Sequence, residues 1–560
     1  MRGKEKSISL LLSLILIISG LFLFDKKEEQ YYFPEVSSPA KAETTDLSAQ
    51  TIEAKSDFDS EEHIGVVGKT NYRSKEIRVD TSFTSNLPLI VIDTGDQEPR
   101  RGVVWNSEKG YYVPTGEDPY AYGEISIINN TNGINRIDDA VALHSLCKVK
   151  LRGNSSGNYD KKQYLLKLTD EEGKAKKKNI LGMGSDSEWI LNVSFIDKSL
   201  LRNYLAYEAI GEIMPYTPDV QFCEVIWKDK AGYRYEGVYL MMESIKVGKD
   251  RVDLPKYSEN SDVTPALLRR DRYNENGLML DNYATQNGLT SGYLDIEYPD
   301  KKDITEKGIQ NITKQVNRFE EALYADSWDE FVKYRDYIDM QSFVDYFILN
   351  EFFLNYDAGY NSTYVYMNYS GKLTMGPVWD FDQAMDNNEK LEANLYTTAF
   401  HSAPWFDQLL RDPVFTDALI KRYAELRKSI LADESIKAFV IETIAYLGDA
   451  IKRDWARWGY YYIDGNYLKT DFYTGKDRNT KTYQEEVEKI LNALSVHGRW
   501  MDEHLDSLYQ FKMLSLEDAQ AWQYQAESKT ERTDYSSMLA VLFVLVFLIS
   551  VKLVLKHESE

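Results

Sequence analysis

Two acidic positions near the centre of the chain have the residue types and the spacing that phosphoryl transfer requires. Asp357 follows a helix-patterned segment, and Asp380 opens an Asp-Phe-Asp triplet that ends at Asp382. In metal-assisted phosphoryl transfer, one carboxylate orients the attacking hydroxyl and a second holds Mg²⁺ on the phosphates. We therefore interpret Asp357 as a candidate catalytic acid and Asp380 as a candidate metal ligand, with Asp382 close to the metal.

A helix and a hairpin must position these acids. Met340 to Leu354 carries apolar residues three to four positions apart, which predicts a helix that ends just before Asp357. Thr363 to Met367 alternates, Asn368 to Lys372 contains a turn glycine, and Leu373 to Val378 has the pattern of a returning strand. A two-stranded ribbon brings its ends together, so we expect both acids to face one small volume. The alternative is that each Asp is a turn residue whose carboxylate bonds its own backbone.

An upstream region has the composition of a phosphate-binding site. Residues 148–151 and 163–168 have strand patterns, and the loop between them is rich in Gly, Asn and Ser. Such a loop can turn backbone N–H groups toward an anion. Lys167 ends a short apolar run and is the first candidate for a phosphate-binding lysine, with Lys162 as the alternative. The candidate nucleotide-binding residues of this region are Arg152, Gly153, Asn154, Ser155, Lys162 and Lys167.

Six short motifs together resemble one protein family. They are LRGNSS (151–156), KKQYLLKL (161–168), ILGM (180–183), DKSLLRN (197–203), GVYLMMESI (237–245) and GPVWDFD (376–382). With these motifs in this order, the region 85–510 resembles the spore coat protein CotH kinases. The resemblance implies an atypical, secretory-type Ser/Thr protein kinase fold that uses ATP and a divalent metal, Mg²⁺ or Mn²⁺. It also implies the catalytic role for Asp357 and the metal-binding role for Asp380.

One position departs from the usual kinase pattern. Typical kinases place a metal-binding Asn five residues after the catalytic Asp, whereas here Asn361 lies at the fourth position and Ser362 at the fifth. Either Asn361 binds the metal after a shift of one residue, or Ser362 takes the place and a second metal is held weakly or not at all.

Two further features are interpreted through the resemblance. Glu243 ends an apolar strand where a kinase-like chain passes to its second lobe, and it is a candidate contact of the nucleotide base. A helix capped by Asp197 is predicted to carry Glu208 and Glu212, and either could pair with Lys167 as the helix glutamate of kinases does. A solvent-facing acid is the alternative for each.

Other classes of function were weighed against the same residues. Gly153 to Gly157 fits the Gly-x-Ser-x-Gly elbow of serine hydrolases, but a turn and a strand follow it where that elbow requires a helix. Two cysteines cannot form a four-cysteine zinc site, and no two of the six histidines have zinc-helix spacing. An inactive kinase-like scaffold and a glycan-binding envelope protein are the alternative functions.

The distribution of patterns predicts an α+β, two-lobed fold of the protein-kinase type. Strand patterns predominate in a predicted N-lobe at 87–255, and helical patterns predominate in a predicted C-lobe at 256–515 that contains the catalytic hairpin. One of the helices is expected behind an Asp303-x-x-Glu306 capping box. The site is expected in the cleft between the lobes.

Apolar segments at both ends predict two transmembrane helices. Ser7 to Phe24 has no charge and follows three basic residues, which is typical of a signal anchor at 1–24, and the segment 536–555 is long enough to cross a bilayer. Residues 25–86 are predicted to form an acidic, flexible stalk. We expect a two-pass protein of the cell membrane, in contact with lipid, with its main domain outside the cytoplasm.

Charge and cysteine content add two expectations. The net charge of −23 argues against nucleic acid as a partner, and the expected partner is a protein substrate with Ser or Thr acceptors. Outside the cytoplasm, Cys147 and Cys223 could form a disulfide, and two buried thiols are the alternative.

Overall fold

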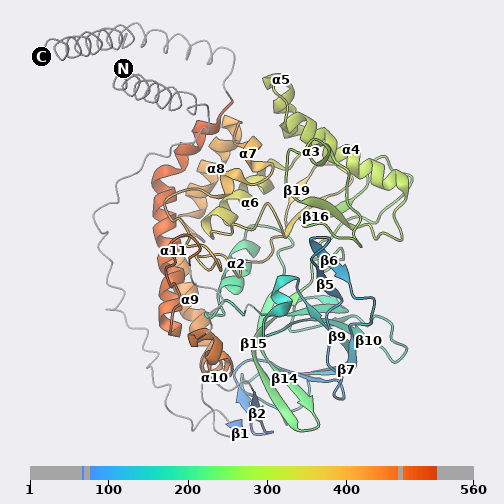
Figure 1. The fold of residues 1–560 in the computed structure, drawn as a ribbon, viewed down its shortest axis with the longest axis vertical. Helices are drawn as coiled ribbons and strands as arrows, with labels where there is room; N and C mark the ends of the chain where they lie inside the picture. Colours follow the sequence, from blue (N-terminus) through green and yellow to red (C-terminus); the bar gives the residue numbers. More distant parts are fainter. Residues whose placement is uncertain (1–65, 68–75, 194, 465–470, 514–560) are drawn as a thin grey trace, which may run out of the picture. The chain divides into compact units, whose positions relative to one another are not determined.

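The computed structural model describes residues 66–67, 76–193, 195–464 and 471–513, and it has a strand-rich lobe followed by a helix-rich lobe (Figure 1). This organisation confirms the predicted mixed α+β class, with a strand-rich part and a helical part. Both predicted membrane spans lie outside these ranges. So do residues 25–75 of the predicted stalk, apart from a two-residue strand, β1 (Val66–Val67). In the described part of the chain, none of the helices combines the length and the apolarity needed to cross a bilayer.

The N-lobe is built on a closed barrel. Among the described residues, seven strands each pair with the next around a ring: β4 (Leu89–Asp93), β7 (Ala121–Ile128), β9 (Leu143–Arg152), β10 (Gln163–Thr169), β13 (Glu188–Asn192), β15 (Gly232–Glu243) and β14 (Val220–Asp229). Strand β14 closes the ring because it pairs with β15 in antiparallel orientation and with β4 in parallel orientation.

Apolar side chains fill the inside of the barrel. They come from alternate positions along each strand, because successive side chains point to opposite faces. Cys147 of β9 and Cys223 of β14 both lie in this core as free thiols, so the structure has two buried thiols and no bond between them. Burial raises the pKa of Cys147 to about 12. The outward residues of β9 and β10 are the ones that can face the second lobe.

Short strands extend the N-lobe beyond the barrel. They are β2 (Ile77–Val79), β3 (Thr84–Ser85), β5 (Val103–Asn106), β6 (Tyr111–Pro114), β8 (Asn135–Arg136), β11 (Lys178–Asn179) and β12 (Ser185–Asp186). Strand β2 pairs with β15, so the folded domain begins earlier than the predicted start at residue 87. Strands β5 and β6 form a hairpin that leaves the barrel beside Leu151, where Arg101 makes a parallel bridge.

The C-lobe combines a small sheet with packed helices. The sheet has the strand order β17 (Tyr293–Tyr298), β16 (Ala266–Asp271), β18 (Thr363–Met367) and β19 (Thr374–Met375). Helix α2 (Arg202–Gly211) lies between β13 and β14 in the sequence. The helices that follow the barrel are α3 (Tyr283–Gln286), α4 (Glu306–Leu323), α5 (Trp328–Phe331), α6 (Met340–Phe352), α7 (Phe406–Leu409), α8 (Pro413–Leu426), α9 (Asp433–Leu447), α10 (Asp449–Asp464) and α11 (Tyr483–His504).

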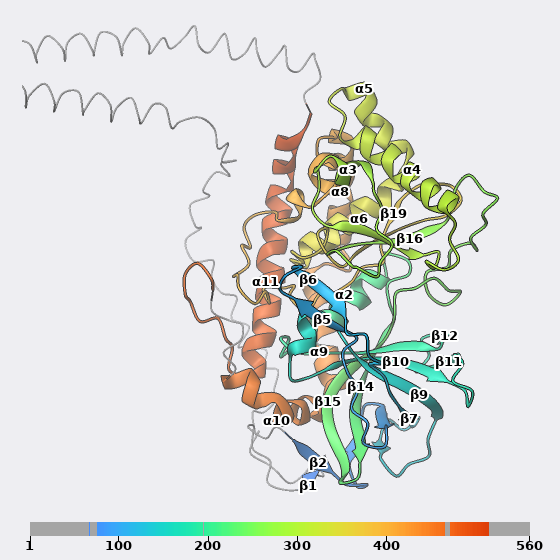
Figure 2. The ribbon, with the colours of Figure 1, turned by 45° about the vertical axis from the view of Figure 1, so that its right-hand side comes forward.

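Helix α10 fixes one side of the barrel to the helical lobe and lies beside β15 (Figure 2). Lys161 and Asp454 form an ion pair of 2.6 Å that is fully buried. Arg453 pairs with Glu224 through two nitrogens at 2.6 and 2.7 Å. Because breaking a buried pair by removing one partner is strongly destabilising, loss of Lys161 or Arg453 should weaken this junction.

Local predictions around the site were mostly confirmed, whereas two predicted caps were wrong. Helix α6 and strand β18 begin where the sequence places them. Helix α4 is capped by Thr305, whose hydroxyl accepts the Gly308 N–H, and not by Asp303. Helix α2 begins at Arg202, so Asp197 is not its N-cap residue, although the Asp197 carboxylate accepts the backbone N–H groups of both Ser199 and Arg202.

Candidate active site

A cleft of about 700 Å³ lies between the outer face of β9 and β10 and the small sheet of the C-lobe. Asp357, Asp380 and Asp382 all line it, although the β18–β19 hairpin separates the first from the other two in sequence. The expectation that the acids face one volume is therefore confirmed as geometry.

Asp357 is held by the turn that follows α6. The Asn361 side-chain amide donates to Asp357 Oδ1 at 2.8 Å, and the Asn361 backbone N–H donates to the Asp357 carbonyl at 3.0 Å. Asn361 is not among the cleft-lining residues, whereas Ser362 is. Asn361 therefore orients the Asp357 carboxylate in this structure.

Asp380 is held in an unusual backbone conformation by α2. Its φ of +66° lies in the left-handed region, which few residues other than glycine adopt without strain. The Asp380 N–H donates to Tyr207 Oη at 3.1 Å, and the Phe381 N–H donates to Asn203 Oδ1 at 2.8 Å. These two bonds from one helix position the carboxylate in the cleft.

The cleft has the charge arrangement that a divalent cation would complete. Burial and the nearby Asp357 raise the pKa of Asp380, and the charge of Arg152 and a side-chain hydrogen bond with Asp382 oppose that increase. A cation would relieve the repulsion between the carboxylates. Among the described residues, no cluster of three or more His, Cys, Asp or Glu could enclose a metal ion alone. Mg²⁺ is often held by one or two carboxylates together with substrate phosphates, so the acids fit this ion.

The predicted phosphate loop lies at the same cleft. Arg152, Gly153 and Asn154 line it, and the Arg152 guanidinium stacks over the Trp379 ring at 4.9 Å. Gly153 has a φ of +97°, and a Cβ at this position would collide with the Ser156 hydroxyl, so the turn requires glycine. The backbone of Ser155 opens a short 3₁₀ turn in this loop.

The lysines lie differently from the prediction. Lys167 Nζ pairs with Glu188 Oε2 at 2.7 Å, and this hydrogen bond raises the pKa of Lys167 even though burial acts against it. Lys162 Nζ donates to the Gly157 carbonyl at 3.1 Å. Neither lysine is among the cleft-lining residues.

The partner of Lys167 is a strand residue, Glu188. The predicted pairing with Glu208 of α2 or with Glu212, which follows α2, is therefore wrong.

Lys150 is the barrel lysine that lines the cleft, and the sequence prediction missed it. Burial, together with the charges of Lys167 and Arg152, lowers its pKa. The signal was present in the sequence, because Lys148, Lys150 and Arg152 alternate along β9 and therefore share its outward face.

Glu243 is not brought to the cleft. It ends β15, pairs with Arg251 and accepts the Asp219 N–H at 3.2 Å. Burial raises the pKa of Glu243 to about 7, an increase that Arg251 opposes. The structure thus places this residue in an ion pair within the N-lobe, and it is not among the residues that line the cleft.

Several further side chains line the cleft from segments far apart in sequence. Arg101 donates to Asn158 Oδ1 at 2.7 Å and to the Asn154 carbonyl, so it braces the phosphate loop. Asp271 and Arg272 enter from the end of β16. The cations that line the cleft are Arg101, Lys150, Arg152, Arg269, Arg272 and Lys390. Five acids line the same cleft, namely Asp271, Asp357, Asp380, Asp382 and Glu389, so the two signs nearly balance. Cations beside acids in one cleft suit an anionic ligand that binds together with a metal cation.

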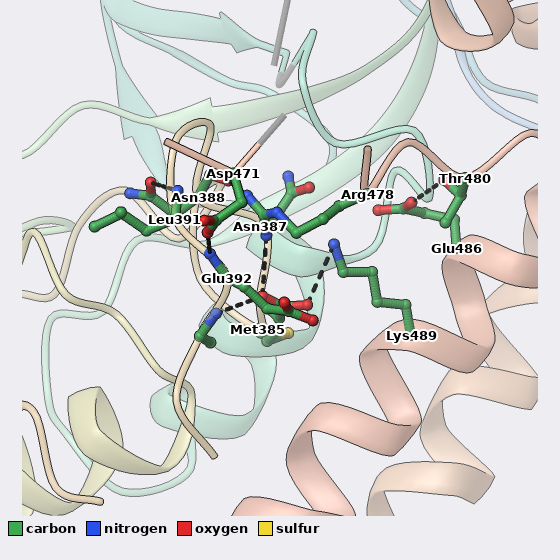
Figure 3. Close-up of polar contacts among 12 residues, drawn as sticks. Met385, Asn387, Asn388, Leu391, Glu392, Asp471, Arg478, Thr480, Glu486 and Lys489 are labelled. Atoms are coloured by element: carbon green, nitrogen blue, oxygen red, sulfur yellow. Dashed lines mark hydrogen bonds and ion pairs between the residues drawn. The ribbon is translucent and has the colours of Figure 1, made fainter. Parts of the chain in front are cut away.

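The segment after Asp382 lines another side of the cleft and is held by contacts with residues 471–489 (Figure 3). Asp386 pairs with Arg478 and Lys489, each at 3.3 Å. Arg478 also donates to the Asn388 carbonyl at 2.8 Å, and Asp471 accepts the Glu392 N–H at 3.0 Å. Because Asn388 and the two residues after it line the cleft, these bonds hold that side in place.

Comparison with known proteins agrees with this geometry. Residues 149–501 match the family model described as CotH kinase protein. None of the curated proteins matches the chain. The match includes the phosphate loop, α2, Asp357, Asp380 and the segment after Asp382, and it covers more than half of the chain. The chain therefore belongs to the CotH kinase protein family, which indicates a kinase-type phosphotransferase function.

Proposed function

We propose that this protein is a membrane-anchored kinase that transfers the γ-phosphoryl group of ATP to a Ser or Thr hydroxyl of a protein substrate with Mg²⁺ or Mn²⁺. The observation that carries the proposal is that Asp357 and Asp380 line one cleft together with the phosphate loop. The family match supports the kinase class, and the nucleotide, the metal and the acceptor residue are the proposed details.

In the proposed reaction, Asp357 accepts the proton of the acceptor hydroxyl as its oxygen forms a bond to the γ-phosphorus. The bond between that phosphorus and the β–γ bridging oxygen breaks, and ADP leaves with the electron pair. Asn361 keeps the Asp357 carboxylate oriented through its 2.8 Å bond. Asp380 and Asp382 would hold the divalent ion, which neutralises charge on the phosphates when bound.

Lys150, Arg152 and the loop at Gly153 are the proposed contacts of the phosphate oxygens. Lys150 replaces the sequence-based choice of Lys167, because Lys150 lines the cleft and Lys167 is paired with Glu188. Stacking of Arg152 on Trp379 keeps its guanidinium close to the metal-binding acids. Most of the rate enhancement then comes from positioning and charge stabilisation.

The membrane part of the proposal is supported by the sequence alone. The uncharged segment Ser7 to Phe24 and the apolar segment 536–555 would anchor both ends of the chain, with the kinase domain outside the cytoplasm. Protease added to intact cells should then digest the kinase domain. Protection of the domain until the cells are opened would contradict this orientation.

The catalytic proposal is tested with the full-length protein in detergent. We expect phosphate transfer from γ-labelled ATP to protein acceptors only when Mg²⁺ or Mn²⁺ is present. Asp380→Asn and Asp357→Asn should abolish transfer without lowering the melting temperature, and the exposed Asp138→Asn should change nothing. Transfer that persists in Asp380→Asn, or a wild-type protein whose melting temperature does not respond to ATP with Mg²⁺, would refute the proposal.

A further inference from the structure

Three tyrosines form a continuous row at the mouth of the cleft. Tyr111 of β6 lies 4.8 Å, between ring centroids, from Tyr273, and Tyr273 lies 5.5 Å from Tyr293 at the start of β17. Both pairs meet edge to face, at interplanar angles of 64° and 74°. We name this row the tyrosine ridge. Tyr273 and Tyr293 are 41% and 39% exposed, so the ridge presents apolar surface to solvent.

The tyrosine ridge lies beside the cleft, although none of its three rings is among the cleft-lining residues. Val103, on the same hairpin as Tyr111, lines the cleft, and so does Arg272, the neighbour of Tyr273. Beside Tyr293, a Cβ added at Gly292 would lie 3.2 Å from the Tyr360 carbonyl oxygen. Tyr360 belongs to the turn that follows Asp357, so the ridge leads from the hairpin to the segment that holds the catalytic acid.

The packing and spacing of the three tyrosine rings favour a peptide over a sugar as the bound ligand. Edge-to-face packing leaves notches between successive rings, whereas a sugar ring stacks on a broad, flat aromatic face. The two centroid distances limit the separation of the outer rings to about 10 Å, so the row spans no more than about one polyproline II turn, which advances roughly 9 Å. Proline-rich segments in this conformation bind grooves lined by aromatic side chains, and they lose little entropy because they are already extended. The ridge thus has the form of a peptide-docking surface.

We propose that the tyrosine ridge binds a polyproline II segment of the polypeptide acceptor, which places the Ser or Thr to be modified at Asp357. This inference rests on the proposed kinase function and adds the substrate class, a proline-containing and extended acceptor region. The ridge bridges the two lobes, and an ion pair of 2.6 Å between Lys109 and Glu275 lies beside it. A bound acceptor would therefore contact both lobes.

The experiment measures peptide binding without nucleotide, by fluorescence anisotropy with the full-length protein. One labelled probe is a short Ser-containing peptide with proline at every third position, and the other has alanine in place of each proline. We expect the proline probe to bind about tenfold more tightly, and Tyr293→Ala to remove that advantage. Tyr446→Ala is the matched control, because Tyr446 on α9 is 43% exposed and also contacts a single ring, Phe222. It should bind the proline probe as the wild type does.

Each other outcome overturns the inference. Equal binding of the two probes, no binding of either, or proline-probe binding that Tyr293→Ala leaves unchanged would exclude a polyproline II site. Binding of a soluble oligosaccharide that Tyr293→Ala abolishes would assign the ridge to glycans instead. Because the assay contains no ATP, failure of the kinase proposal leaves its result intact. If transfer is observed, Tyr293→Ala should raise the KM for the proline peptide about tenfold and leave the KM for ATP unchanged.

Discussion

The phenol oxygen of Tyr207 accepts a hydrogen bond from the backbone N–H of Asp380 at 3.1 Å, so α2 directly sets the geometry of the proposed metal ligand. Tyr207→Phe removes this acceptor and keeps the ring. We expect it to raise the Mg²⁺ concentration for half-maximal activity about tenfold, since groups that orient metal ligands typically contribute this much. The measurement is phosphate transfer against metal concentration.

Tyr204→Phe is the control on the same helix, because its ring packs on Phe222 and Phe439, away from the acids. It should leave the metal dependence unchanged. Equal metal requirements in Tyr207→Phe and the wild type would show that the bond at Asp380 has no influence on the ligand.

The variants Lys150→Met and Lys167→Met test which lysine contacts the phosphates. The structure favours Lys150, whereas the sequence pattern favours Lys167. Loss of a charge-assisted bond should weaken ATP binding about 10- to 100-fold in Lys150→Met. Lys167→Met should remain within about threefold of the wild type, because its ammonium is occupied by Glu188. Calorimetric titration with an ATP analogue measures both, and a larger loss in Lys167→Met would reverse the assignment.

Glu243 should give the protein a recognisable pH dependence of stability. Its folded pKa of about 7 lies above the ordinary value of 4.5, so between these values the folded state binds more protons than the unfolded state. The stabilising contribution of the protonated group is therefore complete below pH 4.5 and is lost as the pH rises through about 7. The loss is at most about 3 kcal/mol, and smaller where water reaches the carboxyl group.

Glu243→Gln should flatten this part of the profile when the free energy of unfolding is measured by denaturant titration from pH 4.5 to pH 8. The exposed Glu212→Gln serves as the control and should keep the wild-type profile. A Glu243→Gln profile parallel to that of the wild type would contradict the raised pKa.

The exposed contact between Lys109 and Glu275 is the weaker of the connections between the lobes. Surface ion pairs contribute about 0–1 kcal/mol, whereas α10 is attached through buried pairs. If nucleotide exchange requires the hairpin to move, linking Lys109→Cys to Glu275→Cys with a cleavable thiol reagent should block turnover. Reduction of the linker should restore it.

Wild-type protein is the control for this experiment, because Cys147 and Cys223 are buried and should not react with the reagent. Full turnover in the linked double variant would show that the cleft exchanges nucleotide without separating the hairpin from the C-lobe.

The parts of the site that were predictable are those encoded by local patterns. Apolar periodicity predicted α6, alternation predicted β18, and the order of helix, acid, hairpin and acid predicted that Asp357 and Asp380 share a cavity. Each of these signals depends on neighbours within a few positions, so one sequence is enough to detect it.

The choice of lysine was not predictable in the same way. Lys150 and Lys167 both point outward from adjacent strands, and only the pairing register shows that Lys167 sits opposite Glu188. The same limit applies to Glu243, whose partner Arg251 lies in a segment without regular periodicity. The parallel pairing of β14 with β4 joins distant segments, so closure of the barrel could not be read from alternation alone.

The closed ring of strands in the N-lobe limits strand exchange between copies of the protein that are crowded on one surface. An open sheet ends in a strand whose backbone donors and acceptors can recruit the same strand of a neighbour, and crowding promotes this exchange. Because β14 bonds to both β15 and β4, the ring itself offers no such terminus. In densely packed copies, the barrel would thus be protected against strand-mediated aggregation by its topology, whereas the sheet of the C-lobe still ends in β17 and β19.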